Sequence, residues 1–174
     1  KKKTRYFQGR CVSAEYLDSF DGQAYFRAHL RPWLWFLTQT SNCRIFQDKT
    51  VIDILRDVFG EHGFSDWQDK TKKSFAKRPY CVQYRESDFD FVSRLMEEEG
   101  IYYFHSCDKT KETLILADDV SSHRPLTDQA EGEFHGRTEK FRFEADHFFE
   151  WRGIEAIQPG KVTLSDFDFE KPKT

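Results

Sequence analysis

The residues best suited to chemistry are His105, Cys107 and Asp108, which lie close together in the chain. On a strand, residues two apart share a face, so His105 and Cys107 could bind one metal ion together. Zinc needs three or four ligands, and no second pair in the sequence has ligand spacing. The sequence therefore predicts neither a metal site nor a bound cofactor.

Paired carboxylates are the second set of candidates. They occur at Asp118 with Asp119, at Glu97 to Glu99, and at Asp166 with Asp168. A glycosidase needs two carboxyl groups that face each other across a cleft, about 5–10 Å apart. The chain has 30 acidic residues, so such pairs arise by chance, and carboxylates are usually exposed. We interpret them as surface groups, with a cell-wall hydrolase as a weaker alternative.

Other catalytic motifs are missing from the sequence. It has no GxSxG nucleophile motif and no glycine-rich phosphate loop of the GxxxxGK or GxGxxG type. We therefore predict no catalytic residue and no cofactor-binding residue, and we expect that the chain is not an enzyme. A carbohydrate-binding module that uses exposed Trp and Tyr is a further weak alternative.

The charge balance argues against nucleic acid as a partner. Lys and Arg number 27 against 30 Asp and Glu, which gives a net charge of −3. The basic segment Lys70–Arg78 contains Phe75, whose ring could stack on a base. A solvated loop is the simpler interpretation of so short a segment.

The apolar runs argue against a membrane-spanning protein, and the cysteine spacing argues against a disulfide framework or a zinc site. No apolar run approaches the roughly 20 residues that span a bilayer, so we expect no membrane span. The cysteines form no CxxC pair and are expected to be reduced thiols; they are Cys11, Cys43, Cys81 and Cys107.

The first element that the pattern predicts is a strand. Apolar and polar residues alternate from Ala24 to Arg31, which indicates a half-buried strand. Pro32 interrupts it, as at a strand edge or a bulge. Trp33 to Leu37 then run without alternation, so we expect a strand-sized piece that is covered on both faces.

The same helix pattern occurs twice. Thr50 with Asp53, and Ser87 with Asp90, stand at capping-box spacing. An apolar stripe follows each cap and predicts one buried helix face. The two stripes are Val51, Leu55, Val58 and Phe59, and Phe91, Val92, Leu95 and Met96.

Glycines are expected to end both helices. Gly60 and Gly100 each follow a stripe and can adopt the left-handed conformation of a helix end. Glu97–Glu99 lie in the last turn, where the helix dipole disfavours anions. We therefore expect a basic group nearby, either Arg94 or one from another segment.

Strands should flank the second helix. Tyr80, Val82 and Tyr84 share a face before it, and Ile101, Tyr103 and His105 share a face after it. A polar turn then leads to an apolar run over residues 113–117, which predicts a hairpin. Residues 118–136 are polar and are the best linker candidate. Beyond them, alternation recurs at Phe141, Phe143 and Ala145, and at Val162, Leu164, Phe167 and Phe169. Many short strands with two short helices predict an α+β fold.

Four blocks of sequence carry a more specific signal. They are RPWLWFLTQTSNCRIFQDKTVIDILRDVF (31–59), KRPYCVQYRESDFDFVSRLMEEEGIYYF (77–104), LILADD (114–119) and PGKVTLSDFDFEKP (159–172). In this order they resemble the VgrG spike proteins of type VI secretion systems and the related baseplate hub proteins of contractile phage tails.

The resemblance implies a fold and a domain organisation. Residues 1–40 would be strands of a first hub β-barrel, residues 41–130 a mixed α/β insert with both helices, and residues 131–174 strands of a second barrel. The chain would be a fragment of such a hub, without the early strands of the first barrel and without the needle.

The resemblance also implies a role in assembly. The protein would form a homotrimer at the tip of the Hcp tube, contact baseplate proteins and carry effector cargo. It would be made in the bacterial cytoplasm, assembled at the envelope and exported. A baseplate or tail hub of a contractile phage or prophage is the alternative within the same class.

Overall fold

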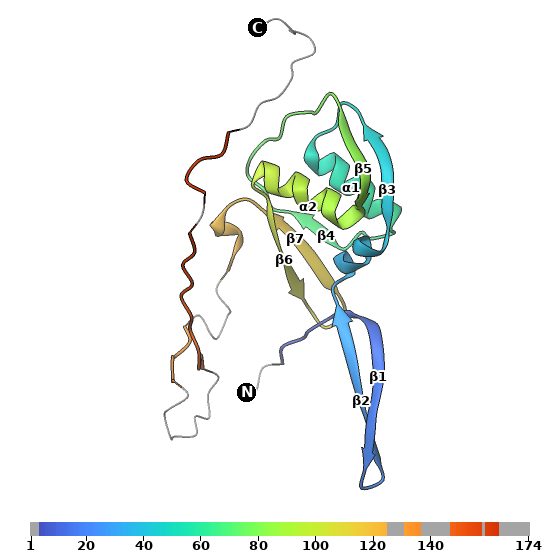
Figure 1. Ribbon diagram of the computed structural model, residues 1–174, viewed down its shortest axis with the longest axis vertical. Coiled ribbons are helices and arrows are strands. Elements are labelled where there is room, and N and C mark those ends of the chain that lie inside the picture. The colour runs from blue at the N-terminus through green and yellow to red at the C-terminus, as the bar shows by residue number, and fades with distance from the viewer. Residues whose placement is uncertain (1–3, 125–130, 137–146, 158, 164–174) are drawn as a thin grey trace, which may run out of the picture. The chain divides into compact units, whose positions relative to one another are not determined.

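The computed structural model describes residues 4–124, 131–136, 147–157 and 159–163, and it divides into two units, residues 1–124 and 125–174. All the named elements among these residues belong to the first unit (Figure 1). In chain order they are β1 (Arg10–Phe20), β2 (Gln23–Arg31), the 3-10 helix η1 (Trp33–Gln39), β3 (Ser41–Phe46), α1 (Val51–Glu61), β4 (Trp67–Asp69), β5 (Cys81–Ser87), α2 (Asp88–Glu99), β6 (Tyr102–Cys107), β7 (Glu112–Ala117) and the 3-10 helix η2 (Val120–Ser122). This mixture of short strands and two α-helices confirms the α+β prediction.

The strands form three separate sheets. β1 pairs with β2, β3 pairs with β5, and β7 lies between β4 and β6. β6 and β7 are antiparallel and form the predicted hairpin, whereas β4 runs parallel to β7. None of these sheets closes into a barrel within the described residues, so the barrel assignment at both ends stays a prediction.

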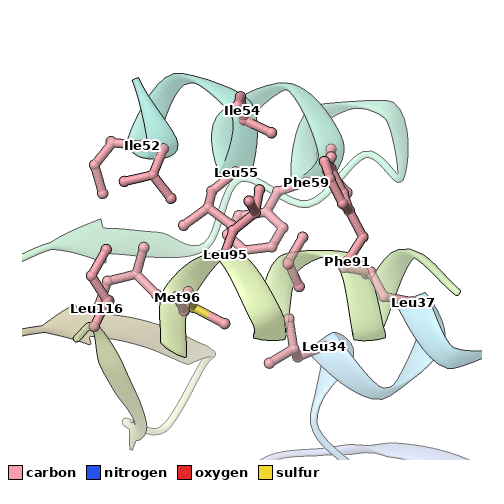
Figure 2. Packing of buried hydrophobic residues seen from close by; sticks show 14 of the residues in the cluster. Leu34, Leu37, Ile52, Ile54, Leu55, Phe59, Phe91, Leu95, Met96 and Leu116 are labelled. Atoms are coloured by element: carbon pink, nitrogen blue, oxygen red, sulfur yellow. The ribbon is translucent and has the colours of Figure 1, made fainter. Parts of the chain in front are cut away.

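The core lies between the two α-helices. In Figure 2, Leu55 and Phe59 of α1 point toward Leu95 and Phe91 of α2. Both predicted stripes are buried, which confirms the 3.6-residue pattern. Burying one such side chain contributes about 1.5–3 kcal/mol. η1 and β7 close the core with Leu34, Leu37, Leu114 and Leu116.

Both helices begin at the predicted caps. The Thr50 hydroxyl accepts the Asp53 N–H, and the Asp53 carboxylate accepts the Thr50 N–H, which completes a capping box. The Ser87 hydroxyl accepts the Asp90 N–H at 3.0 Å. These bonds satisfy N–H groups that have no partner inside the helix.

The helix ends confirm one glycine and correct the other. Gly100 follows α2 with φ 73°, as predicted. Gly60 lies inside α1, and the left-handed residue is Gly63 with φ 72°. The Gly63 N–H donates to the Gly60 carbonyl, and the Phe64 N–H donates to the Phe59 carbonyl. This hydrogen-bond pattern, a Schellman motif, ends the helix at Glu61 and places the left-handed glycine three residues beyond Gly60.

The apolar run after Pro32 is a helix, not an extended piece. Trp33–Gln39 form η1, and Trp33, Leu34 and Leu37 are its buried residues. The Trp35 N–H donates to the Pro32 carbonyl and starts the turn. A short continuous apolar run fits a buried strand and a buried helical turn equally well, so periodicity could not separate them.

The strand predicted from Ala24 is present as β2, but its half-burial is wrong. All nine residues of β2 are exposed in the described structure. On β5 the outer face carries Val82 and Tyr84, whereas Cys81 and Gln83 are buried. The alternation at Phe141, Phe143 and Ala145, and the residues from Leu164 onward, lie outside the described residues.

The second unit has one described β contact. Phe134 and Phe148 form an isolated parallel bridge. The His135 N–H donates to the Phe148 carbonyl at 2.8 Å, and the Phe148 N–H donates to the Glu133 carbonyl at 2.9 Å.

Candidate functional site

The His105 region holds a histidine–carboxylate contact. His105 Nδ1 lies 2.5 Å from Oε1 of Glu112 on the neighbouring strand. The other Glu112 oxygen accepts the backbone N–H of Trp33 at 3.4 Å. Burial lowers the pKa of His105 more than the Glu112 charge raises it. No cluster of three His, Cys, Asp or Glu side chains suited to a metal ion occurs among the described residues.

Asp108 shapes the β6–β7 turn. Its carboxylate accepts the backbone N–H groups of Thr110 and Lys111 and the Thr110 hydroxyl. These hydrogen bonds lower the pKa of Asp108 to about 2. The carboxylate that follows the His105–Cys107 pair in the sequence is therefore part of a turn that local hydrogen bonds stabilise.

Asp118 and Asp119 hold a loop in place. The Asp118 carboxylate accepts the backbone N–H groups of Lys72 and Lys73, both at 2.9 Å. These two bonds lower the pKa of Asp118. Asp119 caps η2 by accepting the Ser121 N–H and pairs with the Lys72 ammonium, and these contacts hold its pKa well below the usual range. Both carboxylates are thus committed to structure; Asp166 and Asp168 lie outside the described residues.

The acidic end of α2 has the expected basic partner. Arg78 donates to Glu98 at 2.9 Å and to Glu99 at 2.5 Å. Arg94 instead pairs with Glu86 of β5. Phe75 packs against the hydrophobic core and is partly buried.

The structure reveals a buried polar cluster that the sequence did not indicate. Asp88 is 2% exposed. One carboxylate oxygen accepts from Arg44 at 2.5 Å and Gln83 at 2.7 Å, and the other contacts His62 at 2.7 Å and Thr40 at 2.9 Å. Burial alone raises the pKa of Asp88, but the hydrogen bonds from Gln83, His62 and Thr40 outweigh it and lower the pKa.

This cluster joins segments that are far apart in sequence. Arg44 comes from β3, Gln83 from β5 and His62 from the end of α1. Asp88 stands in the first turn of α2, where an acidic residue is common because of the helix dipole. Nothing local in the sequence marks it as buried. Both carboxylate oxygens of Asp88 have two partners each within the cluster.

The exposed β1–β2 hairpin is the best candidate for a functional surface. In Figure 1 it extends away from the helices and the other two sheets. Cross-strand partners share a face, so the register defines two faces. The apolar face holds Cys11, Ala14, Tyr16, Ser19, Ala24, Phe26, Ala28 and Leu30, and the polar face holds Arg10, Ser13, Glu15, Asp18, Phe20, Gln23, Tyr25, Arg27, His29 and Arg31.

The apolar face has no cover within the described residues. Phe26 is 69% exposed and Leu30 is 63% exposed. The Tyr16 and Phe26 rings contact each other edge-on at 5.6 Å. A smaller exposed apolar surface is formed by Ile45, Tyr80 and Tyr84 at the β3–β5 sheet. Exposed apolar patches are typical of interaction surfaces.

No helix among the described residues is both long and apolar enough to cross a membrane.

The family comparison identifies the hub domain. The family model described as phage tail baseplate hub (GPD) matches residues 1–174. The chain belongs to the phage tail baseplate hub family. The resemblance seen in the sequence blocks is thereby confirmed.

Relatives of this hub chain occur in type VI secretion systems. The spike protein VgrG1c of Pseudomonas aeruginosa is 44% identical over 98% of the chain and 23% of its own length. The spike protein VgrG3 of Vibrio cholerae is 31% identical over 89% of the chain and 15% of its own length. The hub chain therefore spans about a quarter or less of the curated relatives it matches.

A solved structure resembles the hub chain in fold. The E. coli c3393 protein is described as a component of the type VI secretion system with structural similarity to the T4 bacteriophage tail proteins gp27 and gp5. It aligns with a TM-score of 0.64 and 27% identity over 75% of this chain and 36% of that protein.

Proposed function

We propose that this hub chain is part of a type VI secretion spike protein and that it acts by assembly. The observation that carries this proposal is the β1–β2 hairpin, whose apolar face has no cover in the described residues. The similarity to VgrG spike proteins supports the same role.

The hairpin is physically incomplete without a partner. A two-stranded hairpin alone is marginally stable in water at best. Covering Phe26, Leu30 and Tyr16 would contribute about 1.5–3 kcal/mol for each side chain that becomes fully buried. Burial against other protein thus supplies a driving force for assembly that this unit does not provide by itself.

We further propose that the hub forms a homotrimer at the tip of the Hcp tube, in contact with baseplate proteins and with effector cargo. It would be made in the bacterial cytoplasm and exported after assembly at the envelope. Residues 1–40 would belong to a first hub barrel, residues 41–130 to the insert and residues 131–174 to a second barrel. Catalysis by this chain is not part of the proposal, because Asp108, Asp118 and Asp119 are held in structural hydrogen bonds.

Sedimentation velocity on the full-length gene product tests the assembly proposal. A trimer at micromolar concentration is expected, and the double variant Phe26→Ser with Leu30→Ser should shift the protein toward smaller species. Val120→Ser is the matched control, because Val120 is 81% exposed but lies outside the hairpin. A wild-type monomer at these concentrations would overturn the proposal.

A baseplate hub of a contractile phage is the second candidate, because the matching family is described as a phage tail hub. The neighbouring genes separate the two: sheath, ring and ATPase genes without capsid genes support a secretion system, and capsid genes support a phage.

A further inference from the structure

The base of the β1–β2 hairpin is attached to the rest of the first unit through both strands. Just before β1, the Gln8 side chain donates to the backbone carbonyls of Asp108 and Lys109 in the β6–β7 turn, at 3.1 and 3.0 Å. The Arg10 guanidinium lies over the Phe64 ring at 5.6 Å. The start of β1 is therefore held at two points.

The end of β2 is attached through Trp33, the first residue of η1. Only Pro32 separates β2 from η1, and its ring restricts the backbone at this step. Trp33 is 3% exposed, and its ring stacks on Phe64 with the two centroids 4.6 Å apart. Its indole N–H donates to the Asp66 carbonyl at 3.3 Å. The chain therefore passes from the hairpin into the core with a single, restricted residue between them.

Glu112 contacts the same point from β7. One carboxylate oxygen accepts the Trp33 backbone N–H at 3.4 Å, and the other lies 2.5 Å from Nδ1 of His105. Glu112 is 9% exposed, and no Lys or Arg pairs with it among the residues that the structure describes. Leu114 and Leu116, on the same face of β7, belong to the core. A buried carboxylate costs free energy that an apolar side chain would not cost, so core packing does not explain a glutamate at this position.

We propose that Glu112 is a positioning residue that fixes the direction in which the β1–β2 hairpin leaves the core. Together with Gln8 and Trp33, it makes the hairpin and the two α-helices move as one rigid body. β2 has nine residues, so the hairpin is about 30 Å long. A rotation of roughly 10° at its base would move its tip by about 5 Å.

This inference deepens the proposed assembly role and rests on it for its biological meaning. Protein that covers the hairpin would, through a rigid base, also fix the orientation of α1 and α2. A hairpin that turned freely at its base would leave the helices unplaced in the assembly. The contacts of Glu112 therefore matter for orientation more than for stability.

Double electron–electron resonance on the 174-residue chain tests the rigidity. Nitroxide labels are attached to p-acetylphenylalanine, which leaves the native cysteines unchanged. One label pair replaces Gln23 at the hairpin tip and Glu97 on α2, both of which are exposed. A second pair replaces Gln23 and His29, both on β2, and reports on the hairpin itself. We expect a narrow distance distribution for both pairs in the otherwise unchanged chain.

Variants at Glu112 separate positioning from stability. Glu112→Leu removes the acceptor for Trp33 and should broaden the 23–97 distribution by about 5 Å, the tip displacement worked out above. The 23–29 distribution should stay narrow, and the urea midpoint should not fall, because apolar replacement of a buried charged pair is often neutral or stabilising. Glu112→Gln keeps an acceptor oxygen and should restore the narrow distribution.

Thr113→Val is the matched control. Thr113 is also buried on β7, but its side chain lies on the opposite face, so both distributions should stay unchanged. A 23–97 distribution of unchanged width in Glu112→Leu would overturn the inference, and so would broadening of both label pairs. If Glu112→Leu does not fold, Gln8→Ala decides, because it removes only the contact with the β6–β7 turn. An unchanged 23–97 width in Gln8→Ala would then overturn the inference.

This outcome is separable from the assembly test. A full-length protein that sediments as a trimer, combined with a 23–97 distribution that Glu112→Leu leaves unchanged, would remove the positioning inference and leave the hub function in place. A monomer in sedimentation with the expected response to Glu112→Leu would do the reverse.

Discussion

Replacing Asp88 tests the buried polar cluster most directly. Asp88→Ala would leave Arg44, whose side chain is 12% exposed, without its buried carboxylate. Removing one partner of a buried ion pair costs about 3–5 kcal/mol. Arg44 also pairs with Glu61, so we expect a loss near 3 kcal/mol. That is a large share of the 5–15 kcal/mol that is typical of a folded domain.

Asp88→Asn should cost less, for a geometric reason. The Asp88 oxygen that faces Arg44 and Gln83 accepts from two N–H groups, and these nitrogens can only donate. The other oxygen meets the Thr40 hydroxyl and the His62 ring, which can accept as well as donate. An amide nitrogen can therefore take the second position, and the variant loses mainly the charge. We expect about 1.5–3 kcal/mol, the range for a hydrogen bond to a charged group.

Urea unfolding monitored by Trp fluorescence measures both losses. The control is Asp57→Ala, which removes a carboxylate paired with Lys49 where both side chains are more than one-third exposed. An exposed pair of this kind contributes about 0–1 kcal/mol. The reasoning fails if Asp88→Ala is no more destabilising than Asp57→Ala.

The same carboxylate predicts a pH dependence. The pKa of Asp88 in the folded state lies below the ordinary value of 3.8, so the unfolded chain binds more protons in the acid range. The stability that ionised Asp88 contributes is complete above the unfolded value and is lost as the pH falls through the lower folded value. Asp88→Asn should flatten the fall in stability below about pH 5, whereas an unchanged acid profile would contradict the assignment.

Four further substitutions test the packing and the helix ends. Gly100→Ala should lower the stability of the fold by about 1–2 kcal/mol, because Gly100 has φ 73°. Gly60→Ala should raise the stability by up to about 1 kcal/mol, because Gly60 lies inside α1 with open space around it. Thermal unfolding should therefore show shifts of opposite sign for the two variants. Leu95→Ala should cost about 2–5 kcal/mol in urea unfolding, since Leu95 is fully buried between the helices; a loss below 1 kcal/mol would contradict the core assignment. Arg78→Gln should cost about 1–3 kcal/mol, less at high salt, because it removes both charge pairs with the end of α2; a salt-independent loss would indicate a packing effect instead.

Local patterns predicted the helices well because their causes are local. Thr50 and Ser87 cap helices through bonds to residues three positions on, and both apolar stripes follow the helix period. The end of α1 was misplaced because Gly60 can also continue a helix, and the Schellman motif depends on Gly63 and Phe64 beyond it. Pattern alone also could not separate a strand from a helical turn at residues 33–37.

The candidate site was predictable only in outline. The sequence showed that β2 alternates, and it showed several acids without a catalytic arrangement. It could not show that the apolar residues of β2 face solvent, because alternation reports which residues share a face but not what covers that face. It also could not show that Asp118 binds the backbone of Lys72 and Lys73, since these residues are 46 and 45 positions apart from it in the chain.

By itself, the sequence determined the helix caps, the hub family resemblance and the mixture of helices and strands, because each depends on neighbouring residues or on the order of sequence blocks along the chain. Only the tertiary structure decided that Asp88 lies in a closed polar cluster and that the hairpin β1–β2 presents an apolar face to solvent. Burial and charge pairing depend on which distant segments meet in space, and no local period contains that information.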